Sequence, residues 1–477
     1  MKTKKSIKCI SLLLAVLMLM TSLVGCGKAP VANNNSPTPS GNTATPSETP
    51  KDEPVTITLW SGAYGKFEGQ EPGEWVEKNL IPAWNKEFPN VTVKVEMIPY
   101  DGIQEKVATA ITSGKTPDVF TDTPDRVLGY ANMGVVAPLN DIIPADKLQK
   151  LQANPDIMRM VAVNGDIVTM PWSTGATIMM VNKTIWKNAG AENLLPQNEE
   201  RTWTPEQFLQ ALRAVKDEKK GVYGITLFAL NEQGDQLYNN MMAGFGVKLF
   251  NPENTKYIAA ENPAALDAMK LFKTIVDEKL CTPYPETLTS TNALDYFKQG
   301  KNGMLGAASM AHVKIVADGL ADKSIEAPFE PMLVNYPSTT PNQATLRSVI
   351  GNGCVFKSGD ANREKWAKKF LYWMNAENDV LHIATKPAFN MWGVDMSAVN
   401  TFGTDMEKSE AEYFTKLLSK TSEWPIMDTG ASIVGFPEMR AAMFPEMQSM
   451  FIGRTTPEQT LNNLSDKFNA IIQKYNK

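Results

Sequence analysis

The chain has 477 residues, of which 43% are hydrophobic, and its formal net charge is -5. This length exceeds that of a usual single domain, so we expect two or three domains. The mild acidic balance argues against a nucleic-acid partner, which requires a basic stripe, and only two histidines argue against a histidine-rich metal site. We therefore expect no metal, no cofactor and no nucleic acid.

The first residues have the layout of an export signal. Four lysines among the first eight residues precede the apolar run Ile10 to Met20, which is shorter than the roughly 20 residues needed to span a membrane. Leu23-Val24-Gly25-Cys26 then resembles the lipobox of bacterial lipoproteins, in which the cysteine thiol receives a diacylglyceryl group and becomes the new N-terminus. The resemblance implies a signal peptide over 1–25 and anchoring of Cys26, through acyl chains such as palmitate, to the outer face of the cell membrane. A plain secretory signal with an incidental cysteine is the alternative.

Residues 26–53 are rich in Pro, Ser, Thr and Asn and contain almost no large apolar side chains. Such a segment cannot bury enough surface to offset its ordering entropy. We expect a disordered tether that holds a folded body away from the membrane.

The body begins with alternating strands and helices. Val55 to Trp60 and Val91 to Ile98 are β-rich runs, and a helix-compatible segment with apolar residues such as Trp84 separates them. This strand-helix-strand unit favours parallel pairing. A helix ending near Gly114 and a third strand in "PDVFTD" follow.

Local signals mark two later helices. Thr204 is an N-cap followed by Pro205 and closed by Gln207 as a capping box, and the same T-P-E-Q start recurs at Thr456. Beyond the first 26 residues the only cysteines are Cys281 and Cys354. Their sequence positions leave open whether they form a disulfide or are small core residues.

The order of these segments resembles the family 1 extracellular solute-binding proteins, the maltose-binding-protein-like receptors of ABC importers. The stretches that carry the resemblance run over nearly the whole body: "ITLW", "SGKTPDVFTDTPDRVLGYANMGVVAPLND", "NGDIVTMPWSTGATIMMVNKTIWKNAG", "RTWTPEQFLQAL", "FKQGKNGMLGAASMA", "GNGCVFKSGDANREKWAKKFLYWMN" and "FIGRTTPEQTLNNLSDKF". The resemblance implies two hinge-linked α/β lobes of the type II periplasmic-binding-protein fold, closing on a ligand in the cleft between them.

The resemblance also implies where the lobes divide. We expect an N-terminal lobe over 54–179 and 305–352 and a C-terminal lobe over 180–304 and 353–477. The hinge crossings are expected at Thr177 to Lys183, at Met304 to Ala308 and at Gly351 to Phe356.

Many members of the family bind mono- or oligosaccharides, whose rings stack on aromatic side chains and whose hydroxyls bond to carboxylates and guanidinium groups. Asp125 and Arg126 match an Asp-Arg pair of the maltose-binding protein, and Asp122 stands where that protein has a tryptophan. We expect Asp122 and Asp125 to accept hydrogen bonds from ligand hydroxyls. A helix cap is the alternative for Asp125.

Further candidates lie at the end of the first strand and beside the first crossing. Trp60 and Tyr64 follow the strand, where an α/β sheet displays ligand contacts at its carboxyl edge. Trp172 and Ser173 lie near the expected cleft floor. Gly175 stands where the maltose-binding protein has a glutamate, which argues against a maltodextrin ligand.

The remaining candidates belong to the second lobe: Asp235, Tyr238, Asn240, Met310, His312, Trp392 and Trp424. Met310 and His312 fall where the maltose-binding protein places a stacking tryptophan, and a solvated surface histidine is the alternative for His312. Trp392 and Trp424 lie in loops that often carry a stacking aromatic residue, and a structural tryptophan is the alternative.

An enzyme is the weaker functional class. The acidic residues of "KFEGQEPGEW" are spaced as in a solvated loop, and no G-x-S-x-G, H-E-x-x-H or phosphate-loop motif is present. A sensor that feeds a signalling system, or a receptor for a non-sugar solute, requires the same closing cleft and stays open. We expect a non-enzymatic, monomeric lipoprotein that binds a carbohydrate and delivers it to the permease subunits of an ABC transporter.

Overall fold

A computed structural model gives the fold over residues 53–63, 70–99, 102–122, 124–153, 155–170, 177–230, 234–340, 353–378, 403–419, 430 and 433–475. Asp52–Lys477 form one compact unit by themselves. The predicted signal peptide, Cys26 and nearly all of the tether lie outside the described residues. Within the described ranges, no helix is both long enough and apolar enough to cross a membrane.

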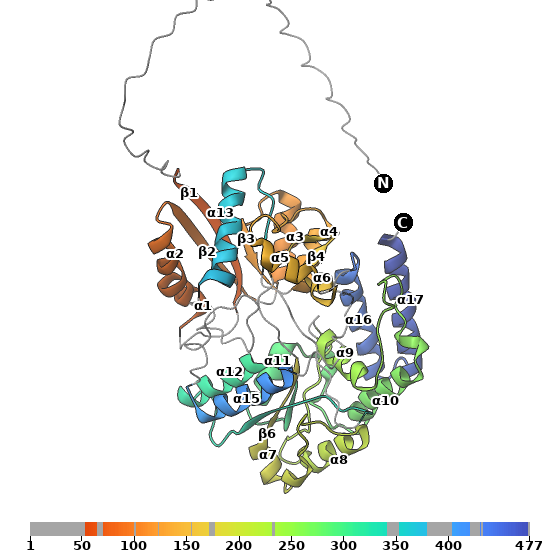
Figure 1. Ribbon diagram of the computed structural model, residues 1–477. Coiled ribbons are helices and arrows are strands. Elements are labelled where there is room, and N and C mark those ends of the chain that lie inside the picture. The colour runs from red at the N-terminus through yellow and green to blue at the C-terminus, as the bar shows by residue number, and fades with distance from the viewer. Residues whose placement is uncertain are drawn as a thin grey trace, which may run out of the picture. The chain divides into compact units, whose positions relative to one another are not determined.

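The first lobe is built on a four-stranded sheet of order β2-β1-β3-β9. The predicted parallel pairing is confirmed, since β1 pairs in parallel with β2 and with β3, while β9 adds an antiparallel edge. Helices cover this sheet, with α13 lying beside its strands (Figure 1). The elements are β1 Val55–Ala63, α1 Pro72–Trp75, η1 Val76–Leu80, α2 Ile81–Glu87, β2 Val91–Pro99, α3 Ile103–Ser113, β3 Val119–Thr121, α4 Pro124–Asn132, α5 Ala145–Gln152, α6 Pro155–Val161, β4 Ala162–Val163, β5 Asp166–Ile167, β9 Cys354–Val355, α13 Ala361–Tyr372 and η5 Trp373–Glu377.

The second lobe is built on a three-stranded sheet of order β7-β6-β8, in which both pairings are antiparallel. Most of its helices lie in the lower part of Figure 1, while α17, the last described helix, rises on the right to the level of the first lobe. The elements are β6 Ile178–Asn182, α7 Lys183–Asn188, η2 Glu192–Leu194, α8 Pro205–Val215, α9 Gly234–Gly244, η3 Ala259–Glu261, α10 Pro263–Asp277, η4 Pro285–Thr287, α11 Ser290–Lys298, β7 Met304–Ala308, α12 Met310–Ala321, β8 Pro331–Val334, α15 Asp405–Ser419, α16 Phe436–Phe451 and α17 Pro457–Tyr475.

The strand pairings correct the expected division of the chain between lobes. Both β7 and β8 pair with β6, so residues 304–334 remain in the second lobe and Met304–Ala308 is not a crossing. In turn, β9 pairs with β3 and α13 packs on β1, which returns residues 354–372 to the first lobe. These strands are short and buried on both faces, so their composition carries no information about which sheet they join.

The helix boundaries predicted from local signals are confirmed. Thr204 and Gln207 form the capping box of α8. The backbone N–H of Thr456 and that of Gln459 each bond to the other residue's side chain at the start of α17. Gly114 ends α3 in the left-handed conformation, with φ of 66°, which favours glycine.

Aromatic residues from distant parts of the sequence fill the core of the first lobe. Trp84 of α2 packs edge-on against Phe370 and Trp373, with ring centres 5.0 and 5.2 Å apart. Cys281 and Cys354 are free, buried thiols, which decides the disulfide question against a bridge. Burial raises the pKa of the Cys281 thiol to about 12, so this group stays protonated and unreactive at neutral pH.

Candidate ligand site

Polar side chains gather at the carboxyl edge of the first sheet, where β1 and β3 end. The hydroxyl of Thr121 donates to the Ser61 oxygen at 2.6 Å. Asp122 comes next, and both its carboxylate oxygens lie 2.9 Å from Nη1 of Arg126 in α4. Both members of this ion pair are buried. The Asp122 carboxylate therefore fixes the Arg126 guanidinium at the edge, and ligand contacts by either residue stay a prediction.

Trp60 lies within β1, next to Ser61, and not after the strand as predicted; its side chain is half-buried. The Nζ atom of Lys106 stands over its indole ring, 4.7 Å from the ring centre, which is the geometry of a cation–π contact. Lys106 also pairs with Glu96, which is the register partner of Trp60 on β2. These contacts orient the indole, and its stacking on a ligand stays a prediction.

Several predicted contacts lie outside the described residues. They are Tyr64, Trp172, Ser173, Trp392, Trp424 and the side chain of Asp125. Their proposed roles rest on the sequence alone.

In the second lobe, three segments run parallel to one another beside the named sheet. Ile225 bridges in parallel to Cys281, and Tyr223 bridges in parallel to Asn302, which lies two residues before β7. The Asn302 side chain ties the three together by donating to the Ile225 carbonyl at 3.0 Å and to the Thr282 hydroxyl at 2.8 Å. The segments following 223–229, 280–282 and β7 therefore emerge side by side at one carboxyl edge.

Met310 and His312 stand at this edge, in the first turn of α12. Both side chains are half-buried. The backbone N–H of Ser309 donates to Nδ1 of His312 at 3.1 Å, so the imidazole closes a capping box. Burial lowers the pKa of His312 to about 4, which keeps the ring neutral and Nδ1 free to accept at neutral pH. His312 thus has a capping role, and contact of Met310 or His312 with a ligand stays a prediction.

The lowered pKa of His312 predicts that acid destabilises the fold. The unfolded histidine titrates near its ordinary value of about 6.5, so between about pH 6.5 and pH 4 only the unfolded state gains a proton. The free energy of unfolding should fall by up to about 3 kcal/mol as pH drops through this window. His312→Asn cannot titrate but keeps a side-chain acceptor, as Asn292 does in the capping box of α11. Urea unfolding near pH 7 and near pH 4 measures the free energy of unfolding at both ends of this window. The decrease between the two pH values should be smaller for His312→Asn than for the wild type. Equal decreases would contradict the prediction.

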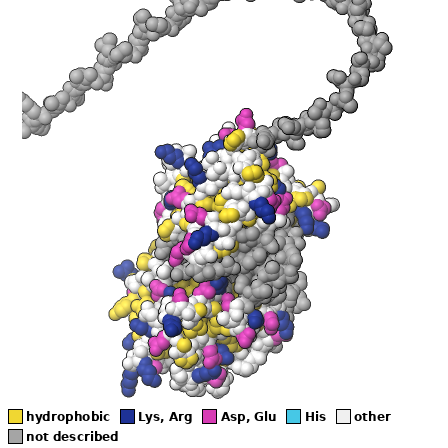
Figure 2. Space-filling model, turned by 90° about the vertical axis from the view of Figure 1, so that its left-hand side faces the viewer, with side chains coloured by type: hydrophobic (Ala, Val, Ile, Leu, Met, Phe, Trp, Pro, Cys, Tyr) yellow, Lys and Arg dark blue, Asp and Glu magenta, His cyan; other side chains and the backbone are white. Residues whose placement is uncertain are grey.

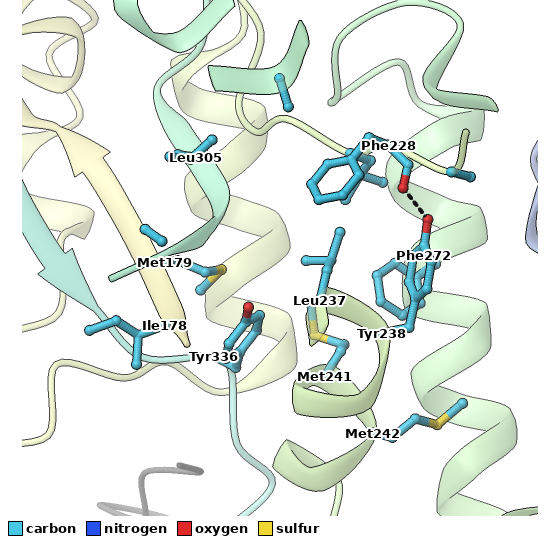
Figure 3. Packing of buried hydrophobic residues seen from close by; sticks show 14 of the residues in the cluster. Ile178, Met179, Phe228, Leu237, Tyr238, Met241, Met242, Phe272, Leu305 and Tyr336 are labelled. Carbon is cyan, nitrogen blue, oxygen red and sulfur yellow. Dashed lines mark hydrogen bonds between the residues drawn. The ribbon is translucent and has the colours of Figure 1, made fainter. Parts of the chain in front are cut away.

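The structure corrects the prediction for Tyr238. This residue of α9 is buried among apolar side chains, and its ring packs edge-on against Phe272 at 5.2 Å. Its hydroxyl donates to the Phe228 carbonyl, as Figure 3 shows. Since the ring and the hydroxyl are both used inside the core, Tyr238 stabilises the second lobe and is not a ligand contact. Asn240 is buried too, and its amide donates to the Gln236 carbonyl at 2.7 Å.

Asp235 is also buried, because Arg440 of α16 covers its carboxylate. Nε of Arg440 lies 2.9 Å from Oδ2 of Asp235, and the two side chains are 5% and 1% exposed. This pair joins helices that are 205 residues apart in sequence. The carboxylate of Asp235, predicted as a ligand contact, is therefore held in an ion pair. No local sequence pattern links two such distant positions, so the sequence alone does not reveal Arg440 as its partner.

Surface charge in the described part of the chain is mixed. Figure 2 shows Lys and Arg side chains interspersed with Asp and Glu over both lobes of the face in view. Among the described residues, no group of three or more His, Cys, Asp or Glu side chains is arranged to hold a metal ion. The candidate site thus consists of hydrogen-bonding side chains and half-buried rings at the carboxyl edges of the first sheet and of the three parallel segments in the second lobe.

Comparison with known proteins identifies the family. Residues 68–378 match the model of the bacterial extracellular solute-binding proteins. The chain belongs to this family. A Brucella abortus (strain 2308) protein described as a binding protein is 22% identical over 396 residues, which cover 82% of this chain and 88% of that one.

Relatives of this solute-binding protein include the diacetylchitobiose binding protein DasA of Streptomyces coelicolor, 25% identical over 52% of this chain and 53% of that one. Among solved structures, the ABC substrate-binding protein Lmo0181 from Listeria monocytogenes, in complex with cycloalternan, is 20% identical. Its TM-score is 0.66 over 88% of this chain and all of that one. This likeness confirms the expected two-lobed, type II periplasmic-binding-protein fold.

Proposed function

We propose that this solute-binding protein captures a mono- or oligosaccharide between its lobes and delivers it to the permease subunits of an ABC importer. The family match over 68–378 carries the proposal, because it makes the chain a receptor for an extracellular solute. A ligand that contacts both lobes stabilises the closed form of the protein, and the closed form presents a different surface to the permease than the open form does. The chain itself would catalyse no reaction.

The choice of a sugar rests on the chemistry of the two edges and on the relatives. In this proposal, the half-buried Ser61 and the adjacent buried Arg126 would bind ligand hydroxyls from one edge, and the Met310–His312 turn would contribute from the other. DasA is named for diacetylchitobiose, and Lmo0181 was solved with cycloalternan, both of which are oligosaccharides. A peptide receptor would require groups that bind charged termini at these edges.

A thermal-shift screen of the purified full chain tests the proposal. Monosaccharides and linear chito-, arabino- and malto-oligosaccharides form one set, and peptides and polyamines form the control set. A ligand at about 100 times its Kd stabilises the folded state by about 2.7 kcal/mol, which should raise Tm by about 3 °C for a chain of this size. A shift with the control set alone would contradict carbohydrate binding and leave the family assignment intact.

We also propose that Cys26 carries the lipid anchor, on the strength of the lipobox-like segment before it. Cells that express the wild type should incorporate radiolabelled palmitate into the protein and retain it in the membrane fraction, because two acyl chains anchor stably. Cys26→Ser should lose the label and appear in the medium. Labelling that persists in Cys26→Ser would contradict this assignment.

A further inference from the structure

Tyr284 is an exposed aromatic residue held in a disfavoured backbone conformation. Its side chain is 73% exposed, the highest value among the large hydrophobic residues that the structure describes as exposed. Its φ of 58° and ψ of 50° lie in the left-handed region, which bulky residues rarely adopt. Neither the exposure nor the conformation stabilises the fold, so a functional reason for this residue is indicated.

The loop around Tyr284 is firmly held. The carbonyl of Tyr284 accepts from the backbone N–H of Thr287 at 2.9 Å and from its hydroxyl at 2.8 Å. Ala229 donates its N–H to the Pro285 carbonyl at 2.9 Å, and Gln448 of α16 donates its side-chain amide to the Glu286 carbonyl at 2.9 Å. Bonds to two other elements therefore fix the backbone that presents the ring, so the ring is displayed from a rigid base.

The topology places Tyr284 in line with the candidate ligand contacts of the second lobe. It follows the outermost of the three parallel segments, 280–282, while Leu230 follows the middle one and Met310 follows β7. Neighbouring strands lie about 4.8 Å apart, so the Tyr284 loop is about 10 Å from the Met310 turn along the edge. Leu230, between them, is itself 53% exposed. The three loops thus form a row at the carboxyl edge, with an aromatic ring at its outer end.

We propose that Tyr284 is an outer subsite that stacks on a sugar ring of a linear oligosaccharide extending from the cleft along this edge. The inference rests on the proposed function and deepens it, because it assigns the chain a ligand of several sugar units. The flat ring suits the apolar C–H face of a sugar, and Leu230 adds an apolar surface under the connecting unit. A monosaccharide in the cleft would not reach Tyr284.

Isothermal titration of the full chain with chito- and malto-oligosaccharides, from the monosaccharide to the tetrasaccharide, tests the subsite. Affinity of the wild type should rise with ligand length. Tyr284→Ala should weaken binding of the longest ligands roughly tenfold and leave the monosaccharide unchanged. Tyr284→Phe should bind like the wild type, since stacking does not require the hydroxyl.

Two further variants separate binding from folding. Tyr475→Ala removes an exposed tyrosine at the end of α17, 42% exposed, and should leave every Kd unchanged. Tyr284→Gly should lose the same affinity as Tyr284→Ala while keeping Tm at or above the wild-type value, because glycine adopts positive φ without strain. A lower Tm for Tyr284→Gly would indicate a structural role for the ring.

The outcomes distinguish the subsite from the function it rests on. If the wild type binds sugars and Tyr284→Ala binds the whole series equally well, the subsite is overturned and sugar binding stands. If Tyr284→Ala leaves every Kd unchanged but slows sugar uptake into cells, the subsite is likewise overturned, and Tyr284 would instead contribute to docking on the permease. If no sugar binds the wild type, the proposed function falls, and the subsite falls with it.

Discussion

Replacing Arg440 with methionine should lower the free energy of unfolding by about 3–5 kcal/mol, because it leaves the buried carboxylate of Asp235 without its cationic partner. Nε of Arg440 donates to Asp235 at 2.9 Å, and the carboxylate is almost inaccessible to water. Removing the cationic partner of a buried carboxylate costs far more than the lost contact alone. Urea unfolding of the wild type and of Arg440→Met measures the loss.

A double variant tests whether the charge or the packing causes this loss. Asp235→Leu combined with Arg440→Met replaces the pair by apolar side chains and should recover most of the stability, since buried pairs often contribute little beyond mutual compensation. The coupling energy from the two single variants and the double variant should then be at least about 2 kcal/mol, because the double variant loses much less stability than the two single variants lose together. A loss below about 1 kcal/mol for Arg440→Met would contradict a stabilising role for the pair.

Replacing Glu410 with alanine should lower the free energy of unfolding by about 3 kcal/mol, because this one carboxylate binds a buried strand amide and a half-buried guanidinium. Its Oε2 accepts from the Leu333 N–H of β8 at 2.7 Å and from Arg201 at 2.7 Å. Arg201 lies over the ring of Tyr413, 3.9 Å from its centre. Glu410 therefore connects α15 to the edge of the second sheet, and its removal leaves the strand amide and the guanidinium without this acceptor.

The matched control is Glu410→Gln, which keeps an oxygen acceptor for the Leu333 amide and should cost about 1 kcal/mol or less. Burial raises the pKa of the Glu410 carboxyl above its ordinary value of 4.5. In mild acid the folded state therefore binds a proton that the unfolded state does not, so the contribution of Glu410 to stability increases as pH falls toward 4.5. Glu410→Gln should lack this contribution. Equal stability losses for the alanine and glutamine variants at neutral pH would contradict the hydrogen-bond argument.

The first sheet shows how far local patterns reach. Alternating β-rich runs and a helix between them predicted the parallel pairing of β1 and β2, because a strand-helix-strand unit has few other ways to close. The short strands β8 and β9 carry no such information. Each is a few mostly buried residues, and only the tertiary structure shows that β8 pairs with β6 and β9 with β3.

For the candidate site, too, the sequence predicts some features and only the structure reveals the others. Sequence order placed Asp122 and Arg126 at the end of the third predicted strand, and the structure has them directly after β3, whereas the position of Met310 and His312 in the first turn of α12 came from the structure alone. It could not show that the oxygens of Asp122 face Arg126, that Nδ1 of His312 caps α12, or that Tyr238 lies in the core. Those outcomes depend on side-chain direction around a helix, where a rotation by one residue exchanges core and surface.

By itself, the sequence determined the α/β class, the parallel start of the first sheet, the helix caps and the family, because these depend on short-range patterns and on the order of segments. Only the tertiary structure decided the lobe of β7, β8 and β9, the Asp235–Arg440 pair and the row that ends in Tyr284. The physical reason is distance along the chain: contacts between residues up to 205 positions apart are fixed by the packing of whole elements, which no local pattern encodes.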